Sequence, residues 1–176
     1  MKKVASFMKV SFEEFLKDYS KKKRMSHLIA NIPWIEKVEK LYNQIVLPKR
    51  ATQGSAGHDF CCYEDITIKP SETVLIPTGI RCHIDNGWVL KIYPRSSLGF
   101  KYKLRLNNTC GIIDSDYFYA DNEGHIFIKM TNESDETVEL KANDAFAQGI
   151  FVEYGITYDD NVDTKRTGGI GSTNKN

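Results

Sequence analysis

Two carboxylates close a short apolar run near the middle of the chain. Gly111 to Ile113 are followed at once by Asp114, Asp116 and Tyr117. Asp and Ser favour turns, because their side chains bond the nearby backbone, so a hairpin turn is one interpretation. A turn does not by itself account for two carboxylates and an aromatic residue in succession, so this segment has to be considered together with the other polar groups of the chain.

A second polar group follows the apolar strand predicted over residues 88–93. Arg95 offers a planar fork of N–H donors, and Ser96 and Ser97 add hydroxyl groups. Gly99 allows the backbone to approach a ligand closely. Together these residues suit phosphate oxygens, although an ordinary strand-end turn would use the same residue types.

Three further segments carry polar groups of related kinds. Asp59, which follows the small residues Ala56 and Gly57, can hold a hydrated magnesium ion, because Mg²⁺ keeps several waters and needs few protein ligands. Gln148 is an amide within an otherwise apolar strand, and a buried amide needs a hydrogen-bond partner. Arg166 precedes a glycine-rich run that can surround anionic oxygens.

Composition limits the classes of protein that these groups can serve. The chain has 176 residues, enough for one domain with a real core, and a formal net charge of +1. A net charge this close to zero gives no overall electrostatic attraction to a nucleic acid or to a membrane surface. The four cysteines lack metal-site spacing and are interpreted as reduced core residues. Without a signal peptide or a long apolar run, we expect a cytoplasmic protein.

Short strands separated by turn residues dominate the chain after residue 45. They are predicted within 65–68, 73–84, 88–93, 104–108, 125–132, 137–141 and 145–154. Strands of this length without a β-α-β rhythm predict an all-β sandwich or barrel.

The two ends of the chain differ from this pattern. A weak strand over 4–10 leads into Ser11, which has capping-box spacing to Glu14, and Pro33 suits the first turn of a second helix. Apolar residues of that second helix recur at Trp34, Val38, Leu41 and Ile45. The polar tail over 159–176 cannot bury enough apolar surface to order itself, so we expect a flexible arm.

Taken in order, the five polar groups resemble the five motifs of the homotrimeric deoxyuridine triphosphatase (dUTPase) family. The correspondence is A-G-x-D plus an apolar residue at 56–60, P-R-S-S at 94–97, G-x-I-D-x-D-Y at 111–117, G-D-x-x-A-Q at 143–148, and an Arg with G-G-aromatic-G-S-T at 166–173. Two positions depart from the family: Asn143 replaces a glycine, and Ile170 replaces the aromatic residue.

The resemblance implies a fold, an activity and an assembly. The fold would be one domain over 1–176, a β-clip or jelly-roll barrel with a helical insertion at 11–44 and the flexible arm at 159–176. The activity would be hydrolysis of dUTP to dUMP and pyrophosphate with Mg²⁺, which keeps uracil out of DNA and supplies dUMP for dTMP synthesis. The assembly would be a homotrimer whose subunits share each active site.

The resemblance also assigns roles to single residues. Asp114 would orient and deprotonate the attacking water, and Asp59 would hold Mg²⁺ through water. The ring of Tyr117 would pack where a ribose 2′-hydroxyl would sit. The substrate-binding residues implied are Arg95, Ser96, Ser97, Gly99, Asn108, Gly111, Tyr117, Gln148, Arg166, Ile170, Gly171 and Ser172.

Two departures from the family leave alternatives open. The loop 118–124 is longer than usual beside Tyr117, and the segment 11–44 could serve a protein partner, which a non-catalytic nucleotide-binding regulator on this scaffold would use. A dCTP deaminase of related fold would need a glutamate in the strand after the third motif. Lys129 stands there instead, which argues against deamination.

Overall fold

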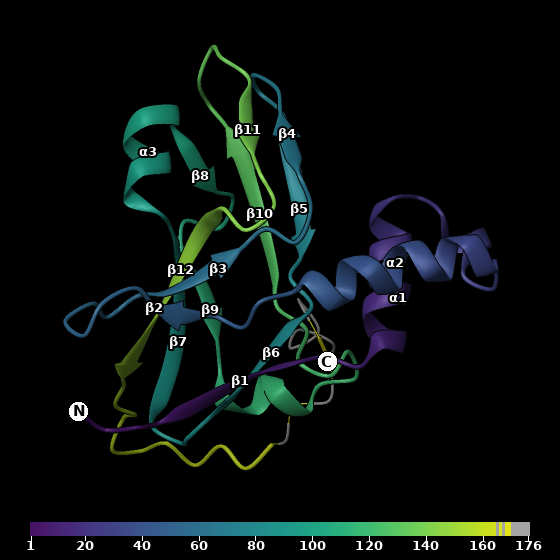
Figure 1. Cartoon of the computed structure of the whole chain (residues 1–176). Coiled ribbons are helices and arrows are strands. Elements are labelled where there is room, and N and C mark those ends of the chain that lie inside the picture. Colours follow the sequence, from purple (N-terminus) through teal and green to yellow (C-terminus); the bar gives the residue numbers. More distant parts are fainter. Residues whose placement is uncertain (165, 167, 170–176) are drawn as a thin grey trace.

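The chain folds around antiparallel β-strands, with two helices set to one side (Figure 1). The computed structural model describes residues 1–164, 166, 168 and 169. The strands are β1 (Ala5–Lys9), β2 (Lys49–Arg50), β3 (His58–Cys61), β4 (Ile66–Ile68), β5 (Thr73–Pro77), β6 (Ile80–Ile84), β7 (Trp88–Pro94), β8 (Leu104–Leu106), β9 (Gly111–Ile113), β10 (Phe127–Asn132), β11 (Val138–Leu140) and β12 (Ala145–Glu153). The helices are α1 (Phe12–Lys22), α2 (Ile32–Gln44) and α3 (Ser96–Tyr102), with 3₁₀ helices η1 (Ser26–Leu28) and η2 (Ser115–Tyr119).

The strands form four sheets within the described part of the chain. The largest has the order β2-β3-β12-β7-β9, the second is β5-β10-β8, and the remaining two are the pairs β1-β6 and β11-β4. Every pairing is antiparallel. The predicted β class, without parallel β-α-β units, is therefore confirmed.

The core is built from the inward faces of the strands, because successive side chains on a strand point to opposite faces. In β10, Ile128 and Met130 are buried while Lys129 between them is exposed. The central strands β7 and β12 bury Leu90 and Phe146. Full burial of one such side chain is worth about 1.5 to 3 kcal/mol. These strands therefore give a rigid support for the polar residues at their ends.

Helices α1 and α2 pack on each other and on the β-sheets through aromatic residues. Phe15 and Tyr19 on α1 are buried, and the ring of Tyr19 stacks on that of Trp34 at a centroid distance of 6.0 Å. The indole Nε1–H of Trp34 donates to Ser20 Oγ at 2.8 Å, and Val38 buries the inner face of α2. The two helices predicted within 11–44 are therefore present.

The start of α1 differs in one respect from the expected capping box. Ser11 is the N-cap, and its Oγ accepts the backbone N–H of Glu14 at 3.1 Å, as predicted. The Glu14 carboxylate instead accepts from Lys17. The backbone N–H of Ser11 donates to Glu123, which is 112 residues away in sequence. The side chain of Glu123 thus takes the place that Glu14 would have in a capping box, and it joins the start of α1 to a distant loop.

The segment after β7 also differs from the expected strand-end turn. Residues 96–102 form the helix α3, which ends at Lys103 in a left-handed conformation. The helix packs on the core through a single buried residue, Leu98. One apolar contact gives no repeating apolar pattern in the sequence, so the helix could not be predicted from periodicity.

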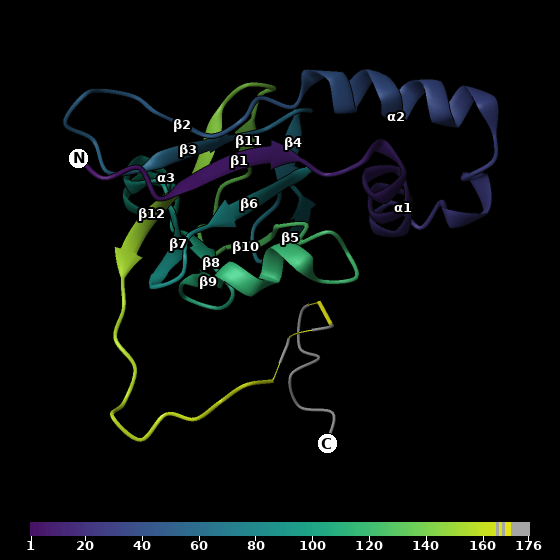
Figure 2. The same ribbon diagram turned by 90° about the horizontal axis from the view of Figure 1, so that it is seen from below.

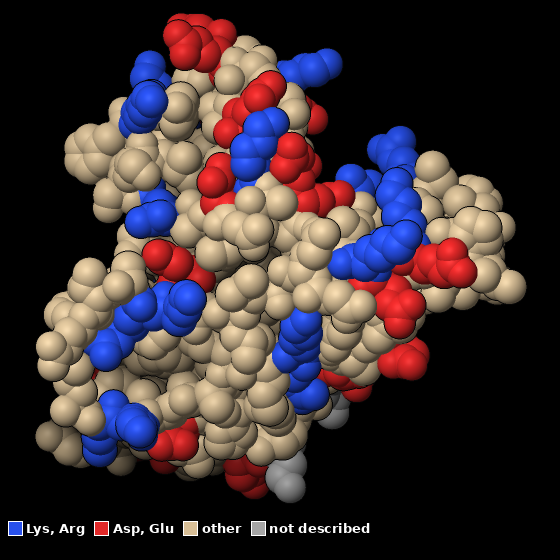
Figure 3. All heavy atoms as spheres, in the orientation of Figure 1, with Lys and Arg blue, Asp and Glu red and all other residues tan. Residues whose placement is uncertain are grey.

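Three general expectations can be compared with the structure. All four cysteines are free, but only Cys62 and Cys82 are buried core residues, and Cys61 and Cys110 are partly exposed. Burial raises the pKa of the Cys62 and Cys82 thiols to about 12, as suits unreactive residues. Basic and acidic side chains are interspersed on the face shown in Figure 3. None of the helices in the described residues has the length and apolar character to cross a membrane.

Candidate active site

A mostly apolar cavity of about 470 Å³ opens beside β9. It is lined by Leu75, Ile92, Leu106, Asn107, Asn108, Gly111, Ile112, Ile113, Tyr117, Phe127, Ile128, Lys129 and Arg166. Of the predicted site residues, it thus brings together Asn108, Gly111, Tyr117 and Arg166. A flat apolar ring with a few polar edges is the kind of ligand that such a cavity fits.

Asp114 follows the last residue of β9, at the edge of this cavity. It is the N-cap residue of η2, but its side chain accepts no capping hydrogen bond. Its Oδ2 lies 3.3 Å from Nη1 of Arg166, and Oδ1 of Asp116 lies 3.2 Å from the same nitrogen. Both carboxylates are about half exposed, at 52% and 55%. Asp114 is therefore accessible to water and to a ligand, and Asp116 shares its cationic partner.

Tyr117 lies within η2, one turn after Asp114, and is 4% exposed. Its hydroxyl donates to the carbonyl of His125 at 2.7 Å and accepts from Asn122 Nδ2 at 2.9 Å. Burial is the main cause that raises the pKa of Tyr117, so the phenol stays neutral. The guanidinium of Arg166 lies 5.1 Å from the centre of its ring. Tyr117 thus presents a fixed aromatic surface to the cavity.

The turn between β8 and β9, together with the first residue of β9, supplies two of the predicted substrate-binding residues. Gly111 lies against β7, since a Cβ there would come 3.1 Å from Cβ of Ile92, so its backbone borders the cavity closely. Asn108 is exposed in the turn and also lines the cavity. Sequence reasoning did not assign Lys129 to the site, although it had singled that residue out as the position of a deaminase glutamate. Its place on β10 opposite the turn, where its carbonyl accepts from Asn107 N–H at 3.0 Å, required the tertiary fold.

The predicted phosphate-binding residues form a second group, at the far end of β7. Nε of Arg95 lies 3.6 Å from Oδ1 of Asp59. Gln148 is the cross-strand partner of Asp59, and its Nε2 donates to the carbonyl of Pro94 at 3.3 Å. The remaining members, Ser96, Ser97 and Gly99, belong to α3, where both serines are exposed. Segments of all five predicted motifs, which are far apart in sequence, thus meet in two groups.

The two groups lie at opposite ends of β7. Ile113, the neighbour of Asp114, pairs with Leu90, whereas Arg95 follows the last residue of β7. Five residues of strand separate Leu90 from Arg95, or about 17 Å at 3.3 to 3.4 Å per residue. In Figure 1, α3 accordingly lies at the upper left, and η2, in green, lies near the bottom. Within one chain, the Asp114 group and the Arg95 group are therefore separate.

The C-terminal segment is described only in part. Residues 154–164 have no regular secondary structure and run clear of the sheets (Figure 2). Arg166 then returns to the carboxylates of Asp114 and Asp116. The predicted site residues Ile170, Gly171 and Ser172 lie outside the described residues.

The residues present fit a magnesium ion that arrives with its ligand. The described part of the chain contains no group of three or more His, Cys, Asp or Glu residues able to hold a metal by themselves. Asp59 offers one carboxylate beside the basic Arg95. Mg²⁺ is commonly bound by one or two carboxylates together with waters and substrate phosphates, which is compatible with this donor set.

A mostly β fold, an apolar cavity beside a half-exposed carboxylate, and arginine and serine donors at a second place are the features that a hydrolase of phosphorylated substrates would use. The family model named dUTPase matches residues 43–174 of the chain. The chain belongs to the dUTPase family, and this membership supports hydrolysis of dUTP as its enzymatic activity. Strand β1 and helix α1, as well as nearly all of α2, precede the matched region.

Individual relatives agree with this assignment. The deoxyuridine 5'-triphosphate nucleotidohydrolase of Lactococcus lactis subsp. lactis (strain IL1403) is 42% identical over 132 residues, which cover 73% of this chain and 88% of that protein. The protein of the same name from Paraburkholderia xenovorans (strain LB400) is 40% identical over 137 residues, covering 73% and 89%. The crystal structure of the dUTPase from Streptococcus mutans superimposes with a TM-score of 0.58 at 40% identity, covering 65% of this chain and 90% of that chain.

Proposed function

We propose that the chain hydrolyses dUTP to dUMP and pyrophosphate by attack of a water molecule on the α-phosphorus, with Asp114 as the general base. The observation that carries this proposal is the half-exposed carboxylate of Asp114 at the edge of the apolar cavity, whose ion-pair partner among the described residues is Arg166. A base must reach the water that it deprotonates, and a half-exposed carboxylate can do so. Arg166 would then turn from Asp114 to the phosphates, because a guanidinium binds phosphate oxygens in a bidentate manner.

The cavity would hold the nucleoside. Asn108 and the backbone at Gly111 would pair with the edge of uracil, since both border the cavity. A site of this kind rejects a wrong base strongly, because buried polar groups would be left unpaired. Tyr117 would lie against the sugar, and its fixed ring would leave no room for a 2′-hydroxyl. The segment with Ile170, Gly171 and Ser172 would close over the base.

The second group would hold the phosphates. Arg95, Ser96 and Ser97 offer charged and hydroxyl donors, and Gln148 and the open backbone at Gly99 complete the clamp. Asp59 would hold Mg²⁺ through water. When bound, Mg²⁺ supplies neutralisation of the charge that develops on the phosphate oxygens.

We further propose that the enzyme works as a homotrimer in which different subunits supply the two groups. Support comes from β7, along which about 17 Å separate Arg95 from Leu90, the partner of Ile113 beside Asp114; this separation is too long for one chain to present both groups to the same phosphorus. Contact of the two groups across a subunit interface would complete the site without any rearrangement of the sheets.

The reaction can be tested with a panel of nucleotides. The purified protein is incubated with Mg²⁺ and separately with dUTP, dCTP, dTTP and UTP, and the products are resolved by chromatography. Selective conversion of dUTP to dUMP and pyrophosphate is the expected result. Formation of dUTP from dCTP would identify a deaminase instead, and binding of dUTP without turnover would identify a regulator. Chelation of the metal should abolish the hydrolysis.

A further inference from the structure

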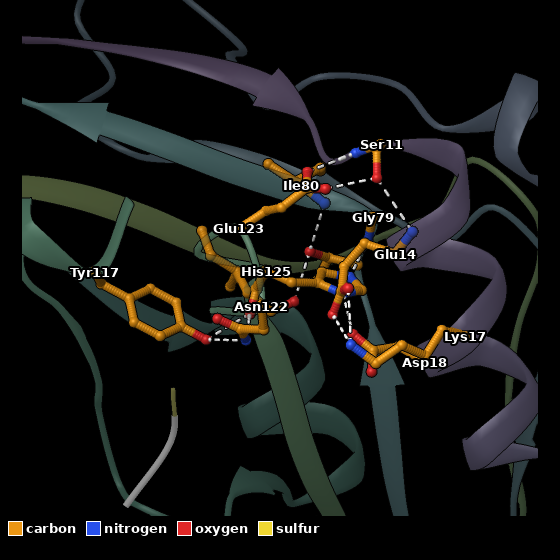
Figure 4. Close-up of polar contacts among 12 residues, drawn as sticks. Ser11, Glu14, Lys17, Asp18, Gly79, Ile80, Tyr117, Asn122, Glu123 and His125 are labelled. Carbon is orange, nitrogen blue, oxygen red and sulfur yellow. Dashed lines mark hydrogen bonds and ion pairs between the residues drawn. The ribbon is translucent and has the colours of Figure 1, made fainter. Parts of the chain in front are cut away.

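The loop between η2 and β10 is attached to helix α1 at two points (Figure 4). At the first point, the N–H and Oγ of Ser11 donate to the two carboxylate oxygens of Glu123 at 2.8 and 2.6 Å. At the second, Nδ1 of His125 lies 2.7 Å from Oδ2 of Asp18. Ser11 and Asp18 precede the region that matches the dUTPase family model, whereas the loop lies within it. Helix α1 therefore holds in place a segment of the region that matches the family model.

The ring of His125 is fixed on both sides. It is fully buried, at 0% exposure, and its Nε2 accepts the backbone N–H of Gly79 at 2.8 Å. Because Nε2 accepts, the ring proton lies on Nδ1 and donates to Asp18. A side chain with partners at both nitrogens has one orientation, and Asp18 of α1 is one of the two groups that define it.

The same residue supports Tyr117 through its backbone. The carbonyl of His125 accepts the Tyr117 hydroxyl at 2.7 Å, and the N–H of His125 donates to the carbonyl of Asn122 at 3.0 Å. Asn122 Nδ2 also donates to the Tyr117 hydroxyl at 2.9 Å. His125 thus links the two residues: its ring bonds Asp18, and its backbone carbonyl bonds the tyrosine that lines the cavity (Figure 4).

We propose that Asp18 and His125 are positioning residues for Tyr117, and that α1 thereby sets the discrimination between deoxyribose and ribose. This proposal rests on the proposed function, in which the Tyr117 ring excludes the 2′-hydroxyl. Exclusion by contact depends on where the ring stands, and a displacement of about 1 Å at an active site can change rates by about a hundredfold. When Asp18 no longer holds the His125 side chain, the His125 carbonyl that accepts the Tyr117 hydroxyl shifts, and the ring of Tyr117 shifts with it.

The test compares variants at Asp18 with a control on the same helix. Asp18→Ala removes the acceptor for His125 Nδ1–H, whereas Asp18→Asn keeps an acceptor oxygen of the same reach. Glu13→Ala removes an exposed carboxylate of α1 that has no part in the series. For each folded variant, kcat and KM are measured for dUTP and for UTP, and the thermal unfolding midpoint is recorded.

A positioning role and a purely structural role give different results. We expect Asp18→Ala to lower the ratio of kcat/KM for dUTP to that for UTP by about tenfold or more, mainly through a higher kcat/KM for UTP, because the displaced ring no longer excludes the 2′-hydroxyl. Asp18→Asn should restore most of the ratio, and Glu13→Ala should match the original protein. Lost stability alone would reduce the amount of active enzyme equally for both substrates and leave the ratio unchanged.

An unchanged ratio in folded Asp18→Ala overturns the proposal. If that variant does not fold, Asp18→Ser takes its place, because the shorter hydroxyl cannot reach Nδ1 while its site still admits a water molecule; an unchanged ratio there has the same meaning. Failure of the proposed function is seen separately, since the original protein would then not hydrolyse dUTP at all.

Discussion

Nη1 of Arg166 lies 3.3 Å from Oδ2 of Asp114, so the proposed general base is paired with a residue from the C-terminal segment. The same nitrogen lies 3.2 Å from Asp116. The two carboxylates therefore have similar surroundings in the absence of nucleotide. Their roles can be separated only by their position relative to a bound α-phosphorus, and substitution is the direct way to do so.

Asp114→Asn should lower kcat for dUTP by about 10² to 10⁴-fold, because general-base catalysis contributes that much and an amide cannot accept the proton. Binding of dUTP should persist, because the cavity and the Arg95 group are untouched. Asp116→Asn serves as the matched control and should lower kcat by less than about tenfold, since it removes only a partner of Arg166. Equal losses for the two variants, measured in single-turnover assays, would mean that Asp114 is not the base.

The separation of Asp114 from Arg95 predicts that inactive subunits can complement each other. Asp114→Asn and Arg95→Gln should each strongly reduce activity. A 1:1 mixture of the two, unfolded and refolded together, should recover about one quarter of the original sites. In random trimers, an intact Asp114 meets an intact Arg95 from a different chain at that frequency. Each variant refolded alone is the control. No recovery in mixtures shown to contain hybrid trimers would place both residues of one site in the same chain.

Gly57 and Gly149 should respond differently to alanine, although both lie near Gln148. A Cβ at Gly57 would collide with Oε1 of Gln148, the end of a flexible side chain, and with no other residue. Gly57→Ala should therefore raise the KM for dUTP, by displacing Gln148, with a stability change below about 0.5 kcal/mol.

A Cβ at Gly149 would lie 2.7 Å from buried Leu90 and 3.2 Å from buried Phe60. Gly149→Ala should cost about 1 to 3 kcal/mol of stability. Chemical denaturation and dUTP kinetics on the two variants give both quantities.

The contact between Glu123 and Ser11 should make stability depend on pH. Burial alone would raise the pKa of Glu123, but hydrogen bonds from the Ser11 hydroxyl and N–H, with the charge of Arg81, outweigh burial and lower it below the ordinary 4.5. A lowered pKa in the folded state adds stability above the unfolded-state pKa, and this stability is lost as the pH falls through the folded-state value. Glu123→Gln should therefore be less stable than the original protein at pH 6 to 7, and the difference should shrink below about pH 4.5.

The source of this pH dependence can be checked in a second background. In Ser11→Ala, the hydroxyl donor is absent, so the added effect of Glu123→Gln and its pH dependence should both be smaller. Urea unfolding of the four proteins between pH 3 and 7 gives the coupling between the two residues. A coupling that does not change across this range would show that another group causes the acid sensitivity.

Much of the fold and of the site was readable from the sequence where the signal was local. Alternating apolar residues and turn residues marked the strands, and Asp114, Asp116 and Tyr117 came together because they share one short segment. Contacts between distant segments were not readable. Asp18 and His125 are 107 residues apart, and Ser11 and Glu123 are 112 apart, so no spacing rule relates them. The sequence pattern therefore predicted the chemical groups of the candidate site and the helix α1, but not the contacts between this helix and the loop beside the site.

Gly124 is the residue that allows the loop to close on η2. Its φ is +70°, and a Cβ there would lie 2.6 Å from the carbonyl oxygen of Tyr117 and 2.8 Å from Cα of Phe118. These are backbone atoms, which cannot move aside as the end of a side chain can. Gly87 is the matched control, because its φ is +85° but a Cβ there would meet nothing within 4 Å.

Alanine at the two glycines should thus separate backbone strain from collision. Gly87→Ala should cost about 1 to 2 kcal/mol, the penalty of a left-handed residue with a side chain. Gly124→Ala carries the same penalty plus a collision worth about 1 to 3 kcal/mol. Since the atoms that it would strike belong to Tyr117 and its neighbour, Gly124→Ala should also raise the KM for dUTP, whereas Gly87→Ala should not. Equal stability losses with equal KM values would mean that the loop can shift away from η2 freely, and that the position of Tyr117 does not depend on it.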